Sequence, residues 1–506
     1  MSDRPGNVNN DEHELNPVSE KSVSRRDFLK IAGIAGAAIG VGGGLGGLLA
    51  ACGGETSTTT ASSAATSAST VVTSATTAAT TATTSAPTSV TAGAAAGREI
   101  KIGFVTPQTG ALAAFGVPDK YCVDRWKESI GTGMVLGDGQ SHPVSITIAD
   151  SQSDVSRGAA VAGDLINNGK IDMMMVADTP DTVVPVVEQC EASGVPCVCT
   201  DCPWQTYIGD RFKTGYKWSY NIFFGGEDTV AAVTQVCDKL QTNKIIGLVM
   251  PNDSDGNYYR DQDMANFPKA GYKMVDGGSY QDGTEDYSNM INTFKSQGVE
   301  IMISVMIPPD FTNFWKQAIQ QNWIPRMVYA GKSGLFPQSV NALGSIANGV
   351  MTDLWWHPAF PFKSSLTGES CQQLADDFEK KANQQWTQPL LHYVLGEMAL
   401  WSLKNAKDPT SKDSIIAATG SMKLDTVMGP IDFSAPLVTP TGSGNSDFPS
   451  GPGHVIKNVY DSGVAVGQWL MQGGKFSFDL VPVGNGANPF LTDNLLSAPK
   501  ALPVKA

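Results

Sequence analysis

The chain has 506 residues and a formal net charge of -14 at pH 7, with 49 acidic and 35 basic side chains. This acidic balance argues against a nucleic-acid-binding protein, because phosphate backbones are bound by clustered lysine and arginine. The first hundred or so residues lack the apolar periodicity of a domain, so the folded part has roughly four hundred residues.

Two adjacent arginines, Arg25 and Arg26, are followed by a phenylalanine and a lysine, which resembles the twin-arginine export signal. The next stretch, 31–51, is apolar but mostly glycine and alanine, and it ends in small residues before Cys52. This ending resembles the lipobox of bacterial lipoproteins, whose cysteine receives a lipid. We therefore expect 1–51 to be an export segment and Cys52 to anchor the protein outside the cytoplasm. An uncleaved transmembrane helix is the alternative, which the many glycines disfavour.

Residues 55–97 consist almost entirely of threonine, serine and alanine. Such a composition buries too little apolar surface to offset the entropy of ordering, so the segment is expected to be disordered. Behind a lipidated Cys52, residues 52–97 are interpreted as a flexible tether between the membrane and the folded part.

Cysteines recur through the folded part. The residues after Cys52 are Cys122, Cys190, Cys197, Cys199, Cys202, Cys237 and Cys371. The spacing of Cys197, Cys199 and Cys202 suggests a metal site, but no histidine is near, and no metal is expected. A buried core cysteine, or a disulfide with Cys190, is the favoured interpretation.

Short apolar strands alternate with amphipathic helices from residue 99 onward. The first series predicts strands over 100–105, 144–148, 171–176 and 197–200, and helices over 116–129, 156–168 and 182–192. The second series predicts strands over 244–250, 272–275, 301–306, 327–329 and 350–354, and helices over 229–240, 259–267, 287–297 and 311–321. This rhythm predicts an α/β fold of two doubly wound parallel-sheet lobes. Such a pair places a ligand crevice at the carboxyl ends of its strands and closes by a hinge.

The last third of the chain is less regular. Helices are predicted over 374–385 and 392–406, a long loop over 434–453, and strands over 455–459 and 464–470.

Four motifs in order carry a family resemblance. They are the strand and turn from Gly103 to Gly116, the Gly-Val-Pro at 194–196, the Asp-Tyr-Ser at 286–288 and the Gln-Trp at 468–469. Their order resembles the type I periplasmic binding proteins, most of all the leucine/isoleucine/valine-binding branch. The resemblance spans roughly 99–483, and each motif alone is weak.

The resemblance implies two lobes joined by three crossing strands. The first lobe would comprise 98–222 plus about 352–452, and the second 223–351 plus about 453–490. It further implies the solute-binding component of an ABC importer, expected to be monomeric and without cofactor. Its partners would be a membrane permease and a small polar ligand of the amino acid, amide or carboxylate class.

The resemblance also implies ligand-binding positions in the first lobe. They are Phe115, Thr179, Thr200, Asp201 and Trp204. Phe115 stands at the position where the family has an aromatic residue that packs on the ligand, although a core phenylalanine is the alternative. Thr179 stands at the position where the family has a hydroxyl that binds the ligand carboxylate. This role is compatible with capping the following helix. Residues 200–204 stand where the family has backbone amides that bind the same carboxylate, but Pro203 has no N–H and so removes one donor.

Four further candidates follow strands of the second lobe. They are Asp255, Tyr258, Lys332 and Trp355. Amino-acid binders of the family place an acid near position 332 to pair with the ligand ammonium, and Lys332 would repel it. The sequence therefore favours a carboxylate-bearing or polar ligand without an α-amine, unless Lys332 points into solvent. Asp255 stands where the family often has a tyrosine that contacts the ligand, with Tyr258 close by. Its carboxylate would accept bonds from an amine or hydroxyls, and an ordinary turn is the alternative. Trp355 lies at a lobe crossover, where an aromatic ring would stack on a flat ligand.

Two other functional classes remain open. The sequence contains no Gly-x-Ser-x-Gly elbow, His-Glu-x-x-His or phosphate loop, which disfavours an extracytoplasmic enzyme. A ligand-sensing receptor of the same fold is the second alternative.

Overall fold

The computed structural model of the chain describes residues 94–212, 214–439, 453–486, 488 and 490–503. The predicted export segment, Cys52 and almost all of the tether lie outside these residues, as does 440–452 of the predicted loop. Within the described ranges, no helix combines the length and the apolar character needed to cross a bilayer.

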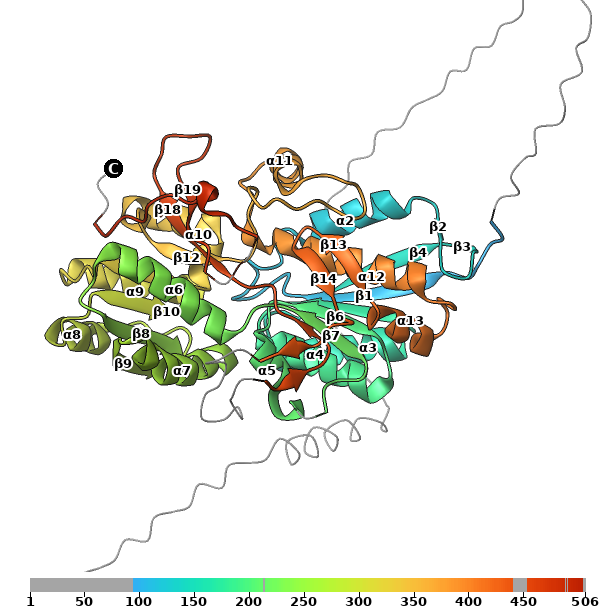
Figure 1. The fold of residues 1–506 in the computed structure, drawn as a ribbon, viewed down its shortest axis with the longest axis horizontal. Helices are drawn as coiled ribbons and strands as arrows, with labels where there is room; N and C mark the ends of the chain where they lie inside the picture. The colour runs from blue at the N-terminus through green and yellow to red at the C-terminus, as the bar shows by residue number, and fades with distance from the viewer. Residues whose placement is uncertain (1–93, 213, 440–452, 487, 489, 504–506) are drawn as a thin grey trace, which may run out of the picture. The chain divides into compact units, whose positions relative to one another are not determined.

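The first sheet is wholly parallel and has six strands. Its order is β17 (Val459–Tyr460), β7 (Ser219–Ile222), β6 (Cys197–Thr200), β5 (Met173–Ala177), β1 (Ile100–Thr106) and β4 (Val144–Asp150). The covering helices are α2 (Asp119–Ile130), α3 (Val155–Asn167), α4 (Pro180–Ser193) and α12 (Tyr393–Asn405). Helices α2 and α12 contact each other on one face, and α3 and α4 contact each other on the opposite face (Figure 1).

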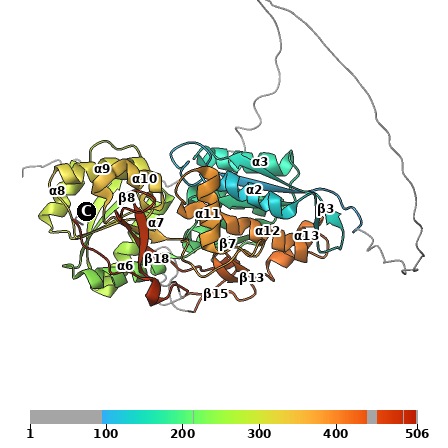
Figure 2. The ribbon, with the colours of Figure 1, turned by 90° about the horizontal axis from the view of Figure 1, so that it is seen from above.

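The second sheet has seven strands. Its order is β19 (Asp479–Gly484), β18 (Ala465–Leu470), β12 (Met351–Leu354), β11 (Met327–Ala330), β10 (Ile301–Ser304), β8 (Ile245–Pro251) and β9 (Lys273–Tyr280). The first two pairings in this order are antiparallel and the others are parallel. Its helices are α6 (Gly226–Leu240), α7 (Ser254–Asn266), α8 (Ser288–Ser296), α9 (Pro308–Gln320) and α10 (Pro337–Leu343) (Figure 2).

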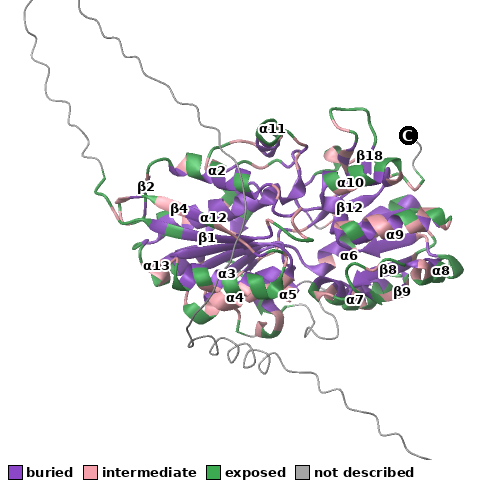
Figure 3. Cartoon of the chain, turned by 180° about the vertical axis from the view of Figure 1, so that it is seen from behind, coloured by how far each residue is buried: buried purple, intermediate pink, exposed green. Residues whose placement is uncertain are grey.

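Burial follows from the layered architecture. Strands β5, β6, β10 and β11 are buried at every position, as expected for parallel strands covered by helices on both faces. Helix α3 instead exposes one face and buries the other (Figure 3), whereas α12 is buried over most of its length. The apolar runs predicted as strands are therefore the centres of the two cores.

Helix starts follow local sequence chemistry. Asp154 caps α3 by accepting a bond from the Arg157 N–H at 2.7 Å. Ser370 and Gln373 form a capping box at the start of α11 (Cys371–Ala382). These caps explain why the helix boundaries lie within a few residues of the predicted ones.

The two lobes of the predicted α/β fold are confirmed, and three connections join them. The chain passes from β7 to α6, leaves the second sheet after β12, and returns from β17 to β18. The last return comes later than expected, because Val459 and Tyr460 still pair with β7 of the first sheet. The strand predicted over 455–459 is in fact two, β16 (Val455–Ile456) and β17, because Asn458 adopts a left-handed conformation between them.

Several elements were not predicted, namely β7, β19, α5 (Trp204–Ile208), α10, α13 (Lys412–Thr419) and the hairpin of β13 (Lys423–Thr426) and β14 (Gly429–Asp432). Most are short, so their periodicity is too brief to read from the sequence.

All seven cysteines among the described residues are buried and unpaired. The disulfide alternative for Cys190 is therefore not realised, and the core interpretation holds. Cys199, on β6, donates toward the Tyr220 carbonyl at 3.5 Å, and burial raises the pKa of its thiol well above the usual value. A protonated, enclosed thiol of this kind is a poor metal ligand or nucleophile.

Candidate ligand-binding site

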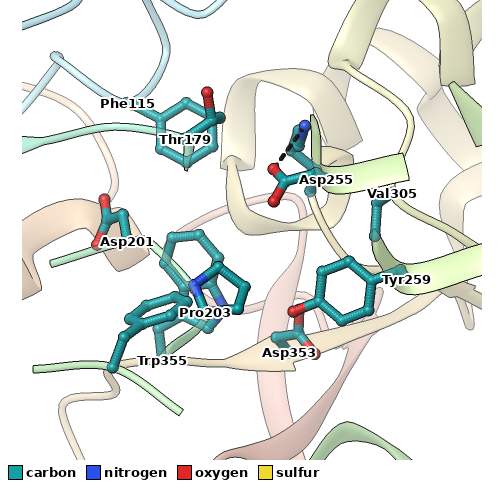
Figure 4. A pocket seen from close by; sticks show the side chains of 11 residues that line it. Phe115, Thr179, Asp201, Pro203, Asp255, Tyr259, Val305, Asp353 and Trp355 are labelled. Atoms are coloured by element: carbon teal, nitrogen blue, oxygen red, sulfur yellow. Dashed lines mark ion pairs between the residues drawn. The ribbon is translucent and has the colours of Figure 1, made fainter. Parts of the chain in front are cut away.

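A small pocket lies between the lobes, at the carboxyl ends of strands from both sheets (Figure 4). Its lining residues are Phe115, Thr179, Asp201, Pro203, Phe223, Asp255, Tyr259, Val305, Lys332, Asp353 and Trp355. The space among them is about 340 Å³, including the part open to solvent. The position is the usual one for ligand sites of two-lobed α/β proteins.

Six of the nine predicted site residues line this pocket, and three do not. The six are Phe115, Thr179, Asp201, Asp255, Lys332 and Trp355. Thr200 instead donates its hydroxyl to the Ile222 carbonyl at 2.9 Å, tying β6 to β7. Trp204 and Tyr258 point to the first connection between the lobes, where they contact Glu227 and the Gly226 N–H.

The aromatic walls of the pocket come from both lobes. Phe115 packs edge-on against Phe336 at 4.9 Å between ring centroids, and Trp355 packs edge-on against Phe223 at 4.9 Å. The turn that carries Phe115 requires glycine next to it, because a Cβ at Gly116 would lie 2.3 Å from the Pro107 oxygen. These rings present apolar faces at the base of the site.

A buried ion triad supports Asp201. The two ring nitrogens of His392 each lie 2.6 Å from a carboxylate oxygen, Nδ1 from Asp119 and Nε2 from Asp201. All three side chains are fully buried. Burial lowers the pKa of His392, but Asp201 and Asp119 raise it more strongly, to about 10. His392 is therefore a cation that holds Asp201 in its left-handed conformation, with φ at 62°, beside the pocket.

A second buried cation, Lys332, is held by two carboxylates of the same lobe. Its Nζ lies 2.9 Å from Asp255 and 3.3 Å from Asp253 (the Lys332–Asp255 ion pair is dashed in Figure 4). The side chain is only 5% exposed, so the solvent-facing alternative is wrong. Burial lowers the pKa of Lys332, but Asp255 and Asp253 raise it well above the usual value. Because its charge is taken up inside the protein, the reason for expecting an anionic ligand is lost.

The side chain of Asp178 lies at the start of α4. Asp178 accepts the Thr182 hydroxyl at 2.8 Å, and burial raises the pKa of its carboxyl to about 7. Pro180 stands at the first helical position and offers no N–H. Thr179 precedes it with extended backbone and makes no capping bond, so its side chain takes no part in capping α4.

Sequence reasoning missed five lining residues, which are Pro203, Phe223, Tyr259, Val305 and Asp353. Tyr259 lies one turn after Asp255 on α7, so these two share a face while Tyr258 points elsewhere. The Tyr259 hydroxyl points toward Asp353 (Figure 4). Asp353 accepts the Tyr329 hydroxyl, and burial raises the pKa of its carboxyl to about 7. The sequence did contain a signal for Asp353, because an aspartate within an apolar strand is unusual and often marks a functional position.

Three carboxylates gather where the first and third connections meet. Glu227, Asp228 and Asp461 have ligand atoms within 4.8 Å of one another, the sole potential metal-binding group among the described residues. Trp204 donates to Glu227 at 3.0 Å, and Gly225 donates to Asp228 at 2.9 Å. Burial raises the pKa of Glu227 to about 7 and that of Asp228 well above its usual value. Bound protons therefore reduce the repulsion within this group.

The lobes also contact each other directly outside the pocket. The Ser254 hydroxyl, at the start of α7 in the second lobe, donates to the Asp181 carboxylate of α4 in the first. Helices α4 and α7 pack together at this point. The structure is therefore in a conformation in which the two lobes touch through α4 and α7.

Comparison with known proteins places these features in context. Residues 99–447 match the sequence model of a family described as Periplasmic binding protein. No curated protein sequence matches the chain.

Solved structures resemble the fold at low sequence identity. A leucine-binding protein from Thermotoga maritima is 16% identical over 75% of this chain and 97% of its own, with a TM-score of 0.60. A branched-chain amino acid transporter substrate-binding protein from Streptococcus pneumoniae, in complex with isoleucine, is 16% identical over 76% and 99%, with a TM-score of 0.57. A solute-binding protein of an ABC transporter from Rhodopseudomonas palustris, in complex with 3,4-dihydroxybenzoic acid, is 17% identical over 66% and 88%, with a TM-score of 0.54.

Proposed function

The chain belongs to the periplasmic binding protein family, and we propose from this premise that it captures a small polar solute between its lobes and delivers it to an ABC permease. The observation that carries the proposal is the interlobe pocket, lined from both sheets at the carboxyl ends of their strands. Its mixture of aromatic faces and carboxylates suits a solute with both apolar and polar parts.

Hinge closure is the proposed mode of capture. Three connections join the lobes, and the contact between Ser254 and Asp181 would break when the lobes separate. A solute that contacts Asp201 and Asp255 at once touches both lobes, so it favours the closed state by its differential affinity.

The proposed location is the outer side of the cytoplasmic membrane. Family membership supports an extracytoplasmic place of action, and Arg25, Arg26 and Cys52 support twin-arginine export followed by lipidation. The serine- and threonine-rich residues 52–97 would then leave the lobes free to reach a permease.

A thermal-shift screen of the purified full-length chain tests solute binding. The panel comprises amino acids, amides, aliphatic and aromatic carboxylates, amines, polyols and small sugars. A solute at about a hundred times its Kd stabilises the folded state by about 2.7 kcal/mol, which gives a readable rise in Tm. Small-angle scattering with and without a hit then measures closure. A panel in which nothing binds, or a hit that is chemically turned over, contradicts the proposal.

A further inference from the structure

Two carboxylate oxygens in the pocket have no partner in the protein. Asp201 Oδ1 belongs to the first lobe and Asp255 Oδ1 to the second, and both atoms are buried without a hydrogen bond. Both residues line the pocket and are more than nine-tenths buried. A buried acceptor left without a donor costs free energy, so each oxygen is suited to a donor that a ligand supplies.

The cations around the pocket do not balance its acids. His392 is engaged by Asp119 and Asp201, and Lys332 by Asp253 and Asp255. Four carboxylates therefore face two cations. Asp178 and Asp353 add further acidic groups beside the same space. The local field therefore attracts a positive charge and repels a negative one.

The pocket also offers no unpaired cation to a ligand carboxylate. Lys332 is its sole basic lining residue, and its ammonium already faces two aspartates. Prolines stand at the start of α4 and directly before α5, so the first amide donor is missing at both helix starts. Asp178 itself occupies the start of α4 through its bond from Thr182.

Aromatic faces complete the arrangement. Phe115, Phe223 and Trp355 stand around the pocket from three separate segments, and Tyr259 closes it from α7 (Figure 4). Aromatic rings stabilise alkylammonium groups through the negative potential of their faces and pack on the attached carbons.

From these observations we infer that the ligand is a compact organic amine in its ammonium form, without a carboxylate, whose charge is met by Asp201 and Asp255 and whose apolar part lies among Phe115, Phe223 and Trp355. This inference rests on the proposed function, because it names the class of solute that the interlobe pocket takes. It differs from the carboxylate-bearing or polar ligand without an α-amine that the sequence favoured.

Matched probes separate the charge of the ligand from its shape. Isopentylamine, leucine and 4-methylpentanoate share one branched alkyl group and carry an ammonium, both charges or a carboxylate. Phenethylamine, phenylalanine and 3-phenylpropanoate form the aromatic set. Isothermal titration of the full chain at pH 7.5 measures all six. At least one amine is expected to bind at least tenfold more tightly than its zwitterion, and neither carboxylate to bind.

Variants of the two aspartates then locate the amine. Asp201→Asn and Asp255→Asn each remove one charge with little change in shape, and each is expected to weaken amine binding about 10- to 100-fold. Glu188→Gln, a carboxylate of the first lobe paired with Arg211 outside the pocket, is the matched control and should leave the affinity unchanged. Circular dichroism and Tm show that each variant is folded, and the two aspartates lie in different lobes, so one folding failure leaves the other informative.

Each outcome decides the inference. Binding of leucine, phenylalanine or a carboxylate in preference to the amines overturns it while solute binding stands. Binding of an amine that neither aspartate variant weakens overturns the assignment of the site. If none of the six probes binds, the inference fails, and the wider solute panel decides separately whether the proposed function fails with it.

Discussion

Removing the cation from the buried triad is the sharpest test of how the site is held. In His392→Gln the side chain keeps its hydrogen-bonding ability but loses its charge, so Asp119 and Asp201 remain buried without a counter-charge. The pKa of His392 stands at about 10 against an ordinary 6.5, a difference that corresponds to about 5 kcal/mol. Breaking a buried pair costs about 3–5 kcal/mol in other proteins, so a loss of that order in the free energy of unfolding is expected at pH 7.

Urea unfolding followed by circular dichroism measures this loss. The control is the triple variant Asp119→Asn, His392→Gln, Asp201→Asn, which removes all three charges together. Because no buried charge is then left alone, the triple variant should recover more than half of the stability lost in the single one.

The pH dependence follows from the direction of the shift. The folded pKa of His392 lies above the unfolded one, so its contribution is fully present below about pH 6.5 and is lost as the pH rises toward 10. The stability of the wild type relative to the triple variant should fall across that window. A single-variant loss below about 1 kcal/mol, or a triple variant no more stable than the single one, would refute the reasoning.

Three further predictions address other parts of the chain. Burial raises the pKa of Glu227 to about 7, so its contribution to stability is present below pH 4.5 and lost as the pH rises through 7; Glu227→Gln should gain up to about 3 kcal/mol relative to wild type between pH 4.5 and 8 by urea unfolding. Lys332→Met leaves Asp253 and Asp255 without their counter-charge, and a fall in unfolding free energy of about 3 kcal/mol is expected at pH 7, whereas an unchanged Tm would mean that the pair is not formed. Cys52→Ala should move the exported protein from the membrane fraction to the soluble extracytoplasmic fraction in a cell fractionation, and a membrane fraction that keeps the variant would contradict lipid anchoring.

The pocket residues show where sequence reasoning succeeded and where it failed. Thr179 and Asp201 were found because they closely follow strands, and in a doubly wound sheet those positions meet at one edge, whereas Phe115 was found through the family resemblance of its turn. Tyr258 was predicted because it lies close in sequence to Asp255, where the family often has a tyrosine, and the helix was expected to begin only at 259. With α7 beginning at Ser254, the helical phase carries Tyr259 toward the pocket and Tyr258 away from it.

The charge of Lys332 was interpreted from a single residue, so its pairing with Asp253 and Asp255 inside the protein could not be foreseen. Its two partners stand on another strand–helix unit, some eighty residues earlier in the chain, where a sequence pattern gives no pairing. Likewise, nothing in the sequence joins His392 to Asp119, which lies 273 residues away.

By itself the sequence determined the two-lobed α/β fold, because strands buried between helix layers are continuous apolar runs that can be recognised in the sequence. It also determined the edge at which the ligand pocket opens, because chain direction fixes where parallel strands end. Only the tertiary structure decided the charge of that pocket, since electrostatic pairing depends on distances between segments remote in the chain. Lys332 and His392 are neutralised by such pairs, and Asp201 and Asp255, which line the pocket, are each left with one unpaired oxygen.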